Sequence, residues 1–363
     1  MLARTAVRSL VRALPLLLLP ATAAAQQRVT LAGDAAIYDL AGQVRLQAGS
    51  GSSVTVDVRT AGEDAGKLKV VSGAAGAWQV LRIVFPDDDI VYPAMGQYGT
   101  NNLDVRENGT FGDASFWKEE GGAGGESLTS AATHRVRITG DGSGLRAHAD
   151  LVIEVPAGKR VAVFLGVGRV DAENVDGRLR VSTSSGDVAF TGVRGTTNIG
   201  TGSGDVRLAQ VTGDVSAATG SGDVTVQGVR GGSVVLRTGS GDVTGSTLVG
   251  TRLDVDTGSG DVKVGGVSAP TCILRTGSGD IRVGLTGSPE TVRVSTGSGD
   301  VTLALPEGMG AKLRASSGSG DINHSLPVTL VRQREGLLEG TLGDGRGTLE
   351  VSTGSGDIHL TRG

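Results

Sequence analysis

The sequence predicts an all-β protein in which a parallel β-solenoid of about ten coils follows an irregular N-terminal β region. Three observations predict this fold class. The tripeptide Ser-Gly-Asp recurs nine times at nearly constant spacing, apolar residues alternate with polar ones before it, and aromatic residues make up only 3% of the chain. Regularly spaced Val, Leu and Ile with frequent Gly are typical of short strands joined by tight turns.

The first 25 residues have the features of a bacterial secretory signal peptide. Arg4, Arg8 and Arg12 precede the apolar run ALPLLLLP, and three alanines before Gln26 supply a cleavage site. The apolar run is too short for a permanent membrane span, and no Cys for a lipid anchor stands at the cleavage site. We therefore expect an exported protein of the periplasm or the cell surface, with no integral membrane segment in the mature chain.

Charge and cysteine content exclude several classes of partner. The net charge is −4, and loss of three arginines with the signal peptide makes the mature chain more acidic. Nucleic acid and anionic membranes bind concentrated positive charge, so neither is expected as a partner. Cys272 is the single cysteine, which excludes an intramolecular disulfide, and it occupies a position that predicts burial.

The Asp residues of the motif define the repeat. They follow one another at 18, 18, 19, 19, 19, 20, 21 and 36 residues. A slowly growing period followed by a doubled one indicates stacked coils rather than independent hairpins. The nine positions are Asp187, Asp205, Asp223, Asp242, Asp261, Asp280, Asp300, Asp321 and Asp357.

Inward-facing columns appear at every second position before each Asp. Thr or Ser stands four residues before it, and apolar residues stand six and eight before it, mostly separated by charged residues that we expect to face outward. The apolar pattern resumes one residue after the Asp, so the alternation breaks within Gly-Ser-Gly-Asp. A break of this kind in a Gly-rich tetrapeptide predicts a corner of the chain.

Each coil should therefore hold two strands, a short third side and about three bends, with coils stacked in parallel at roughly 4.8 Å. The crossover preference favours a right-handed solenoid. An open stack of β-hairpins is the alternative. One degenerate coil precedes the regular ones, with Arg169 in the Asp position 18 residues before Asp187. Residues 327 to 348 should form a bulging or degenerate coil before a last regular coil at 349 to 360.

The predicted organisation is a signal peptide at 1–25, an irregular N-terminal region at 26–160 and the solenoid at 161–363. Seven of the ten aromatic residues lie between Trp78 and Trp117. The segment 85–145 is expected to be an insertion, and the N-terminal region either caps the rod or begins it in imperfect coils.

The residues also resemble a known family. The stretch VPAGKRVAVFLGVGRVDAENVDGRLRVSTSSGDV, the serial TGSGDV motifs and the final LEGTLGDGRGTLEVSTGSGDIHL resemble a bacterial family of exported β-strand-repeat proteins. That family is catalogued as adhesins or as a domain of unknown function. The resemblance is close over about 145 to 363 and implies an exported β-solenoid. It offers no catalytic residues.

Two interpretations of the Asp row are open. In the first, each Asp is a structural corner residue whose carboxylate accepts backbone N–H groups of its own turn. In the second, the row is a calcium ladder like the β-roll of repeat toxins. The first is preferred, because Asp follows Gly directly here and the opposite bend has no regular Asp. We expect no other cofactor, no metal ligand set among the histidines and no catalytic residues.

The aromatic cluster is the other candidate site. Trp78, Tyr92, Tyr98 and Trp117 could form a ligand surface on which sugars stack, or they could form the hydrophobic plug of a capping unit. Asp87, Asp88 and Asp89 are interpreted as a solvated acidic turn. Most loops between coils have four to seven residues, too short for the walled cleft of a pectate lyase or glycosidase.

The sequence thus predicts a non-enzymatic, adhesin-like binding or structural protein of the cell envelope, whose ligand would be a glycan or a protein. The alternative is a carbohydrate-binding or carbohydrate-active β-helix protein that uses the N-terminal insertion. Self-association through exposed end coils is a third possibility. Arg169 in the first Asp position favours a structural role for the row, because a corner tolerates charge reversal more readily than a ligand site does.

Overall fold

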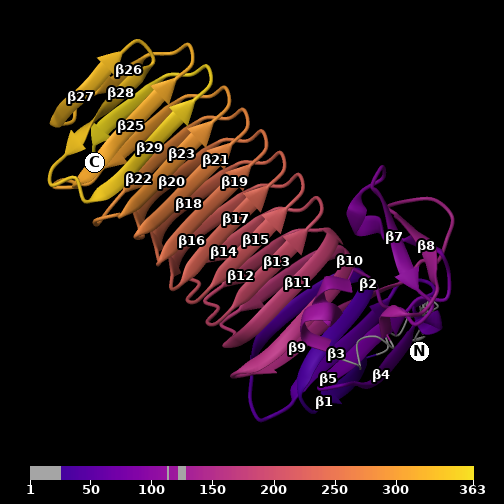
Figure 1. The fold of residues 1–363 in the computed structure, drawn as a ribbon. Coiled ribbons are helices and arrows are strands. Elements are labelled where there is room, and N and C mark those ends of the chain that lie inside the picture. The colour runs from indigo at the N-terminus through magenta and orange to yellow at the C-terminus, as the bar shows by residue number, and fades with distance from the viewer. Residues whose placement is uncertain (1–25, 113, 122–127) are drawn as a thin grey trace, which may run out of the picture.

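The computed structural model describes residues 26–112, 114–121 and 128–363, which form a rod built almost entirely of β-strands (Figure 1). The predicted signal peptide, residues 1–25, lies outside the described residues. Within them, one sheet of 27 strands runs the length of the rod, and most of its pairings are parallel. The predicted all-β class and the parallel β-solenoid are therefore confirmed. No helix in the described ranges is long and apolar enough to cross a membrane.

The regular coils between residues 177 and 305 contribute two strands each. The first strands are β11 (Gly177–Ser185), β13 (Thr197–Thr201), β15 (Val215–Thr219), β17 (Ser233–Thr238), β19 (Arg252–Thr257), β21 (Thr271–Thr276) and β23 (Thr291–Thr296). The second strands are β12 (Val188–Thr191), β14 (Val206–Ala209), β16 (Val224–Arg230), β18 (Val243–Val249), β20 (Val262–Ser268), β22 (Ile281–Leu285) and β24 (Val301–Leu305). Each strand pairs in parallel with its equivalent in the next coil, so Val255 faces Leu274 one repeat later.

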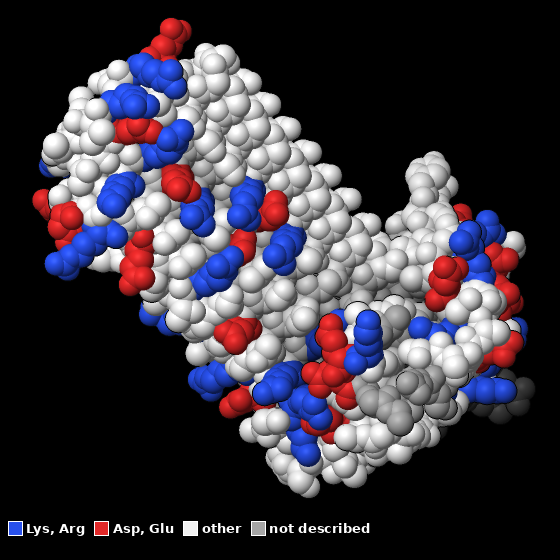
Figure 2. All heavy atoms as spheres, viewed as in Figure 1, with Lys and Arg blue, Asp and Glu red and all other residues white. Residues whose placement is uncertain are grey.

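The core of the rod consists of the predicted inward columns. All nine residues six positions before the motif Asp are buried, from Val181 to Val351, and so is Cys272 in the neighbouring column. Burying one Val or Leu side chain contributes about 1.5–3 kcal/mol, so the stacked columns supply most of the hydrophobic stabilisation. Charged side chains face outward. Figure 2 shows positive and negative side chains interleaved on the viewed face. One such pair joins Arg293 to Glu350 of the adjacent coil at 2.8 Å.

The N-terminal strands continue the parallel stacking before turning antiparallel. β10 (Lys159–Glu173) pairs in parallel with β11 and with β2 (Asp34–Gly49), which in turn pairs in parallel with β9 (His148–Pro156) and β5 (Trp78–Val84). Antiparallel pairings then end the sheet. They join β3 (Val54–Ala61) to β9 and to β1 (Gln26–Leu31), and β4 (Lys69–Ala75) to β5, with the short helix η1 (Ala65–Lys67) before β4.

The segment between β5 and β9 forms a separate small unit on the side of the rod, which we name the N-terminal unit (Figure 1). Its three-stranded sheet contains β6 (Asp89–Val91), β8 (Thr133–Thr139) and β7 (Thr100–Arg106). The short helical turns η2 (Pro93–Met95), α1 (Ala114–Phe116) and η3 (Trp117–Gly121) connect these strands. A second hydrophobic core, which includes Tyr38 and Phe164 of the rod, joins this unit to β2 and β10.

The coils near the C-terminus are stacked out of sequence order. β29 (Gly347–Thr353) lies between β23 and β25 (Ala311–Ser317), and β30 (Ile358–Arg362) lies between β24 and β26 (Ile322–His324). The segment predicted as a degenerate coil, 327 to 348, is instead an antiparallel hairpin of β27 (Val328–Arg334) and β28 (Leu337–Leu342). β28 pairs with β25 in antiparallel orientation, so the hairpin caps this end of the rod.

Candidate binding site at the interrupted corner ladder

The Asp residues of the repeat link neighbouring coils. The Oδ1 atom of each accepts the backbone N–H of the next Asp along the rod, at 2.8–3.0 Å in eight successive steps. The order in space is 187, 205, 223, 242, 261, 280, 300, 357 and 321, and we name this column the corner ladder. The predicted capping within each turn is wrong in this respect. Coils only about 4.8 Å apart bring the next N–H within reach of a short side chain.

The Thr column supports the corner ladder from inside the rod. In the regular coils, Oγ1 of the Thr accepts the N–H of the Gly three residues later and donates to a Gly carbonyl of the preceding coil. For Thr238 these hydrogen bonds measure 3.1 Å to Gly241 N and 2.8 Å to Gly222 O. The Thr side chain therefore hydrogen-bonds the corner of its own coil and the corner of the preceding coil.

Some outer carboxylate oxygens of the corner ladder meet arginines. Arg207 lies 2.7 Å from Asp205, and Arg282 lies 2.9 Å from Asp280. Among the described residues, no three His, Cys, Asp or Glu side chains group together in a way that would hold a metal ion. The calcium interpretation of the row stays an untested prediction.

The corner ladder is interrupted where the rod meets the N-terminal unit. In register with Asp187, the ladder positions of β10, β2 and β9 are Arg169, Gln43 and Asp150. Asp150 behaves as a ladder residue, since its Oδ1 accepts the N–H of Gln43 at 2.9 Å. The two positions between Asp150 and Asp187 carry no carboxylate, because Gln43 and Arg169 stand there.

The Thr column is interrupted in the same two coils. Asp39 and Leu165 occupy its positions there, and both are buried. Leu165 has no polar side-chain atom, and Oγ1 of the neighbouring Thr183 has no hydrogen-bond partner among the described residues. Oδ2 of Asp39 is likewise buried without a partner in the described part of the chain. The hydrogen-bond pattern of the regular corners therefore ends at Thr183 and Asp187.

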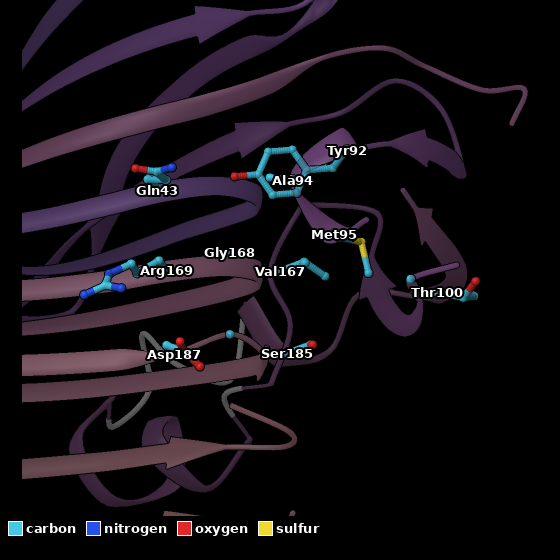
Figure 3. A pocket seen from close by; sticks show the side chains of 12 residues that line it. Gln43, Tyr92, Ala94, Met95, Thr100, Val167, Gly168, Arg169, Ser185 and Asp187 are labelled. Atoms are coloured by element: carbon cyan, nitrogen blue, oxygen red, sulfur yellow. The ribbon is translucent and has the colours of Figure 1, made fainter. Parts of the chain in front are cut away.

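A pocket of about 410 Å³ lies over the interruption, and we name it the ladder-gap pocket. The rod contributes Gln43, Val167, Gly168, Arg169, Ser185, Gly186 and Asp187, and the N-terminal unit contributes Tyr92, Ala94, Met95, Gly99 and Thr100. Figure 3 shows Gln43, Arg169 and Asp187 one below the other on neighbouring strands, with Tyr92, Met95 and Thr100 beside them. A volume of this size is in the range of small-molecule sites.

Three groups at or beside the ladder-gap pocket, Arg169, Tyr92 and Asp39, have raised pKa values. Asp171 lies 2.8–2.9 Å from the Arg169 guanidinium, and its hydrogen bond raises the pKa of Arg169. Burial, and secondarily the carboxylates of Asp150 and Asp39, raise the pKa of Tyr92 to about 12. Burial also raises the pKa of Asp39 well above its ordinary value, which favours the neutral acid. Tyr92 and Asp39 thus both favour their protonated forms.

The predicted aromatic ligand surface is not formed. Trp78, Tyr92 and Trp117 are 2%, 4% and 3% exposed, whereas Tyr98 is 91% exposed and stands apart from them. Trp117 donates its Nε1 hydrogen to the hydroxyl of Tyr38 at 2.8 Å, and its ring packs edge-on against Trp78. Buried rings cannot stack on a sugar. Trp78 and Trp117 are buried because α1 and η3 fold back onto the rod, where Nε1 of Trp78 donates to the carbonyl of Glu120 at 3.3 Å. The aromatic clustering alone does not reveal this.

The acidic turn after Pro86 lies elsewhere. Asp89 pairs with Arg137 at 2.8 Å, Asp88 approaches His134 at 3.4 Å, and Asp87 accepts the N–H of Asp89 at 3.1 Å. These side chains do not line the ladder-gap pocket. Cys272 is buried in its column, and burial raises the pKa of its thiol to about 11.

The fold and the corner ladder define a class: a β-solenoid repeat protein whose coils are joined by side-chain carboxylates. The chain belongs to the Toastrack DUF4097 family, whose model matches residues 150–361. This is a domain of unknown function.

Comparison with solved structures finds a crystal structure of a "putative cell adhesion protein" from Clostridium sporogenes. It is 11% identical, covers 94% of this chain and 100% of its own, and has a TM-score of 0.23. No curated protein sequence matches the chain.

Three lining residues of the ladder-gap pocket stand out in the sequence: Arg169, Tyr92 of the aromatic cluster and the corner residue Asp187. Arg169 stands out because it breaks the Asp column, although a charge reversal at that position favours a structural corner over a ligand site. Gln43 lies in a stretch without the Ser-Gly-Asp motif, so its ladder position emerges only from the pairing of β2 with β10. Met95 and Thr100 reach the pocket through the fold of the N-terminal unit.

Proposed function

We propose that this protein is an exported, non-enzymatic binding protein of the cell envelope, in which a stiff solenoid supports a ligand site at the ladder-gap pocket. The observation that carries the proposal is the contrast along one column of corners. In the regular coils each corner carboxylate accepts the backbone N–H of the next corner, whereas Gln43 and Arg169 line a pocket instead. Polar groups that converge on a concavity are the usual basis of a binding site.

The composition of the ladder-gap pocket favours binding over hydrolysis. Among its described lining residues, Asp187 is the single carboxylate, and its Oδ1 already accepts the N–H of Asp205 at 3.0 Å. Glycosidases use a pair of carboxyl groups on either side of the scissile bond. A carbohydrate-active protein is the alternative function, and it would have to use this same pocket, because the aromatic surface proposed for it is buried.

The first experiment uses the mature chain, residues 26–363, as bait for envelope glycans and envelope proteins. A matched pair of variants tests the site. Thr100→Trp introduces a large side chain at the ladder-gap pocket, and Thr244→Trp introduces the same side chain at an exposed position of β18. We expect Thr100→Trp to lose the captured ligand and Thr244→Trp to retain it. Equal capture by both variants would place the ligand elsewhere.

Two further measurements test export and the absence of turnover. Fractionation of native cells should place the protein in the periplasm or on the surface, and recovery in the cytoplasm would contradict the proposal. Incubation with a polysaccharide panel should release no reducing ends. Release that depends on Asp187 would replace the binding function with the carbohydrate-active alternative.

A further inference from the structure

We propose that the ladder-gap pocket binds a carboxylate group of its ligand, at the place where the corner ladder itself lacks a carboxylate. This inference rests on the proposed binding function and names the chemical class that the site would recognise. It follows from the corner ladder, the donors that surround the gap and the local balance of charge.

The corner ladder shows what the backbone at this position binds. In eight successive steps, the N–H of the next ladder residue is bound by an Asp carboxylate of the neighbouring coil. At Asp187 the neighbouring coil supplies Arg169, whose guanidinium has only donors and cannot accept that N–H. The backbone N–H of Asp187 therefore has no ladder carboxylate to bind, and both Asp187 and Arg169 line the pocket. Backbone N–H groups and a guanidinium are both donors that bind carboxylates.

The other polar groups of the pocket are also able to donate. Gln43 presents an amide, and Thr100 and Ser185 present hydroxyl groups. Tyr92, with its raised pKa, keeps its hydroxyl hydrogen. Val167 and Met95 supply apolar surface for the carbon skeleton of the ligand.

The local charges permit an anion. Arg169 is held by Asp171 through Nε and Nη2, and its side chain remains half exposed. Asp39 favours the neutral acid and so adds little repulsion. Asp187 is the single carboxylate among the described lining residues; its Oδ1 accepts a backbone N–H, and its Oδ2 lies 3.7 Å from Arg207. Asp150, whose carboxylate contributes to the raised pKa of Tyr92, accepts the N–H of Gln43 through Oδ1. The pocket volume of about 410 Å³ suits one or two units of a polymer.

Two sources share this chemistry: an acidic sugar of a glycan and the free carboxylate of a peptide. The test uses both, by titration calorimetry on the mature protein. The glycan probe is a trimer of galacturonic acid, compared with its methyl ester. The peptide probe is N-acetyl-Ala-Ala with a free carboxylate, compared with its amide. We expect one acid to bind at least tenfold more tightly than its neutral form, and the arm that binds identifies the source.

Arg169→Asp is the decisive variant, because it restores a carboxylate to the corner ladder and removes the cation. We expect it to weaken binding of the acid at least tenfold while circular dichroism and the thermal midpoint show a folded rod. Arg237→Asp makes the same change of charge at an exposed position of β17 and should leave binding unchanged. Arg169→Lys, which keeps the cation, should retain part of the affinity.

Equal binding of the acid and its neutral form, or full binding by Arg169→Asp, would overturn the carboxylate proposal. If the neutral forms bind and Thr100→Trp abolishes that binding, the pocket remains a binding site and only the carboxylate proposal fails. If neither acid binds at millimolar concentration, the carboxylate proposal fails as well. The proposed binding function is a separate claim. It fails only if Thr100→Trp captures as much envelope ligand as the unchanged protein.

Discussion

The corner at Thr238–Asp242 and the corner at Leu165–Arg169 occupy equivalent places in the same solenoid, yet they differ in how their polar groups are used. At the first, Thr238 and Asp242 bind groups of their own and adjacent coils. At the second, Leu165 and Arg169 replace both side chains, and a pocket lies over the site. The strand pairing is parallel and in register at both.

This difference teaches that the backbone path of a coil does not depend on the corner side chains alone. Stacking of the inward columns keeps the coils in register even where the corner ladder stops. A repeat protein of this kind can therefore exchange a structural corner for a ligand site without changing its fold.

The largest effect is expected from Gly260→Ala in a regular corner. A Cβ atom there would lie 1.9 Å from the carbonyl oxygen of Gly241, so neighbouring coils would have to move apart. We expect a loss of more than about 3 kcal/mol in the free energy of unfolding, measured with denaturant. Gly265→Ala is the control, because a Cβ at Gly265 meets nothing within 4 Å. Similar stability of the two variants would show that corners are not closely stacked.

The next effect concerns the pH dependence of stability. The folded-state pKa of Asp39 is raised, mainly by burial, so the folded chain holds its proton where the unfolded chain has lost it. Its contribution therefore makes stability fall as pH rises from the ordinary pKa of Asp towards the raised value, by up to about 1.4 kcal/mol per pH unit. Asp39→Thr, which installs the residue of the regular coils, should remove this slope. The measurement is a series of denaturant unfolding curves across pH. An unchanged slope in the variant would contradict the burial of an ionisable Asp39.

Two Thr→Val changes compare the corners directly. Thr238→Val removes the acceptor for Gly241 N–H and the donor to Gly222 O, and should cost about 1–3 kcal/mol. Thr183→Val removes a buried hydroxyl that has no partner among the described residues, so it should be neutral or stabilising. Thermal and denaturant unfolding of both variants would measure the difference. Equal losses would mean that the interruption does not extend to the Thr column.

The smallest effect is expected from a single step of the corner ladder. Asp242→Ala removes the acceptor for Asp261 N–H, which lies 2.8 Å from Oδ1, and should cost about 1 kcal/mol. Asp242→Asn retains a side-chain oxygen and should lose less. Arg169→Ala breaks only an exposed ion pair and should cost about 0.5 kcal/mol. A larger loss at Arg169 than at Asp242 would reverse the roles assigned to the two corners.

Much of the solenoid was predictable because its determinants are local and repeated. The spacing of the nine Asp residues and the alternation around them predict the coil length, the inward columns and the burial of Cys272. The direction of the Asp hydrogen bonds was not predictable. A bond within the turn and a bond to the next coil need the same residue types, and only the stacking distance decides between them.

The order of the C-terminal coils and the ladder-gap pocket depend on contacts between segments that are far apart in the chain. Residues 349 to 360 carry the ordinary repeat pattern, which fits equally well beside β23 or beside β25. The sequence therefore does not indicate that β29 lies between these two strands. The ladder-gap pocket forms where β2, β10 and the N-terminal unit meet, and most of its residues belong to no repeat. The choice between a ligand surface and a hydrophobic plug for Trp78 and Trp117 stayed open, because the turn of α1 and η3 that buries them has no recognisable sequence pattern.

The placement of β29 and β30 between earlier coils has a consequence for how this end of the rod loses its structure. A simple repeat array frays from its terminal coil, because that coil has one neighbour. Here the coil of β29 and β30 has neighbours on both sides, and the β27–β28 hairpin covers the coil beyond it. Opening this end therefore breaks several pairings together, so amide hydrogens of residues 311 to 362 should exchange as one cooperative unit.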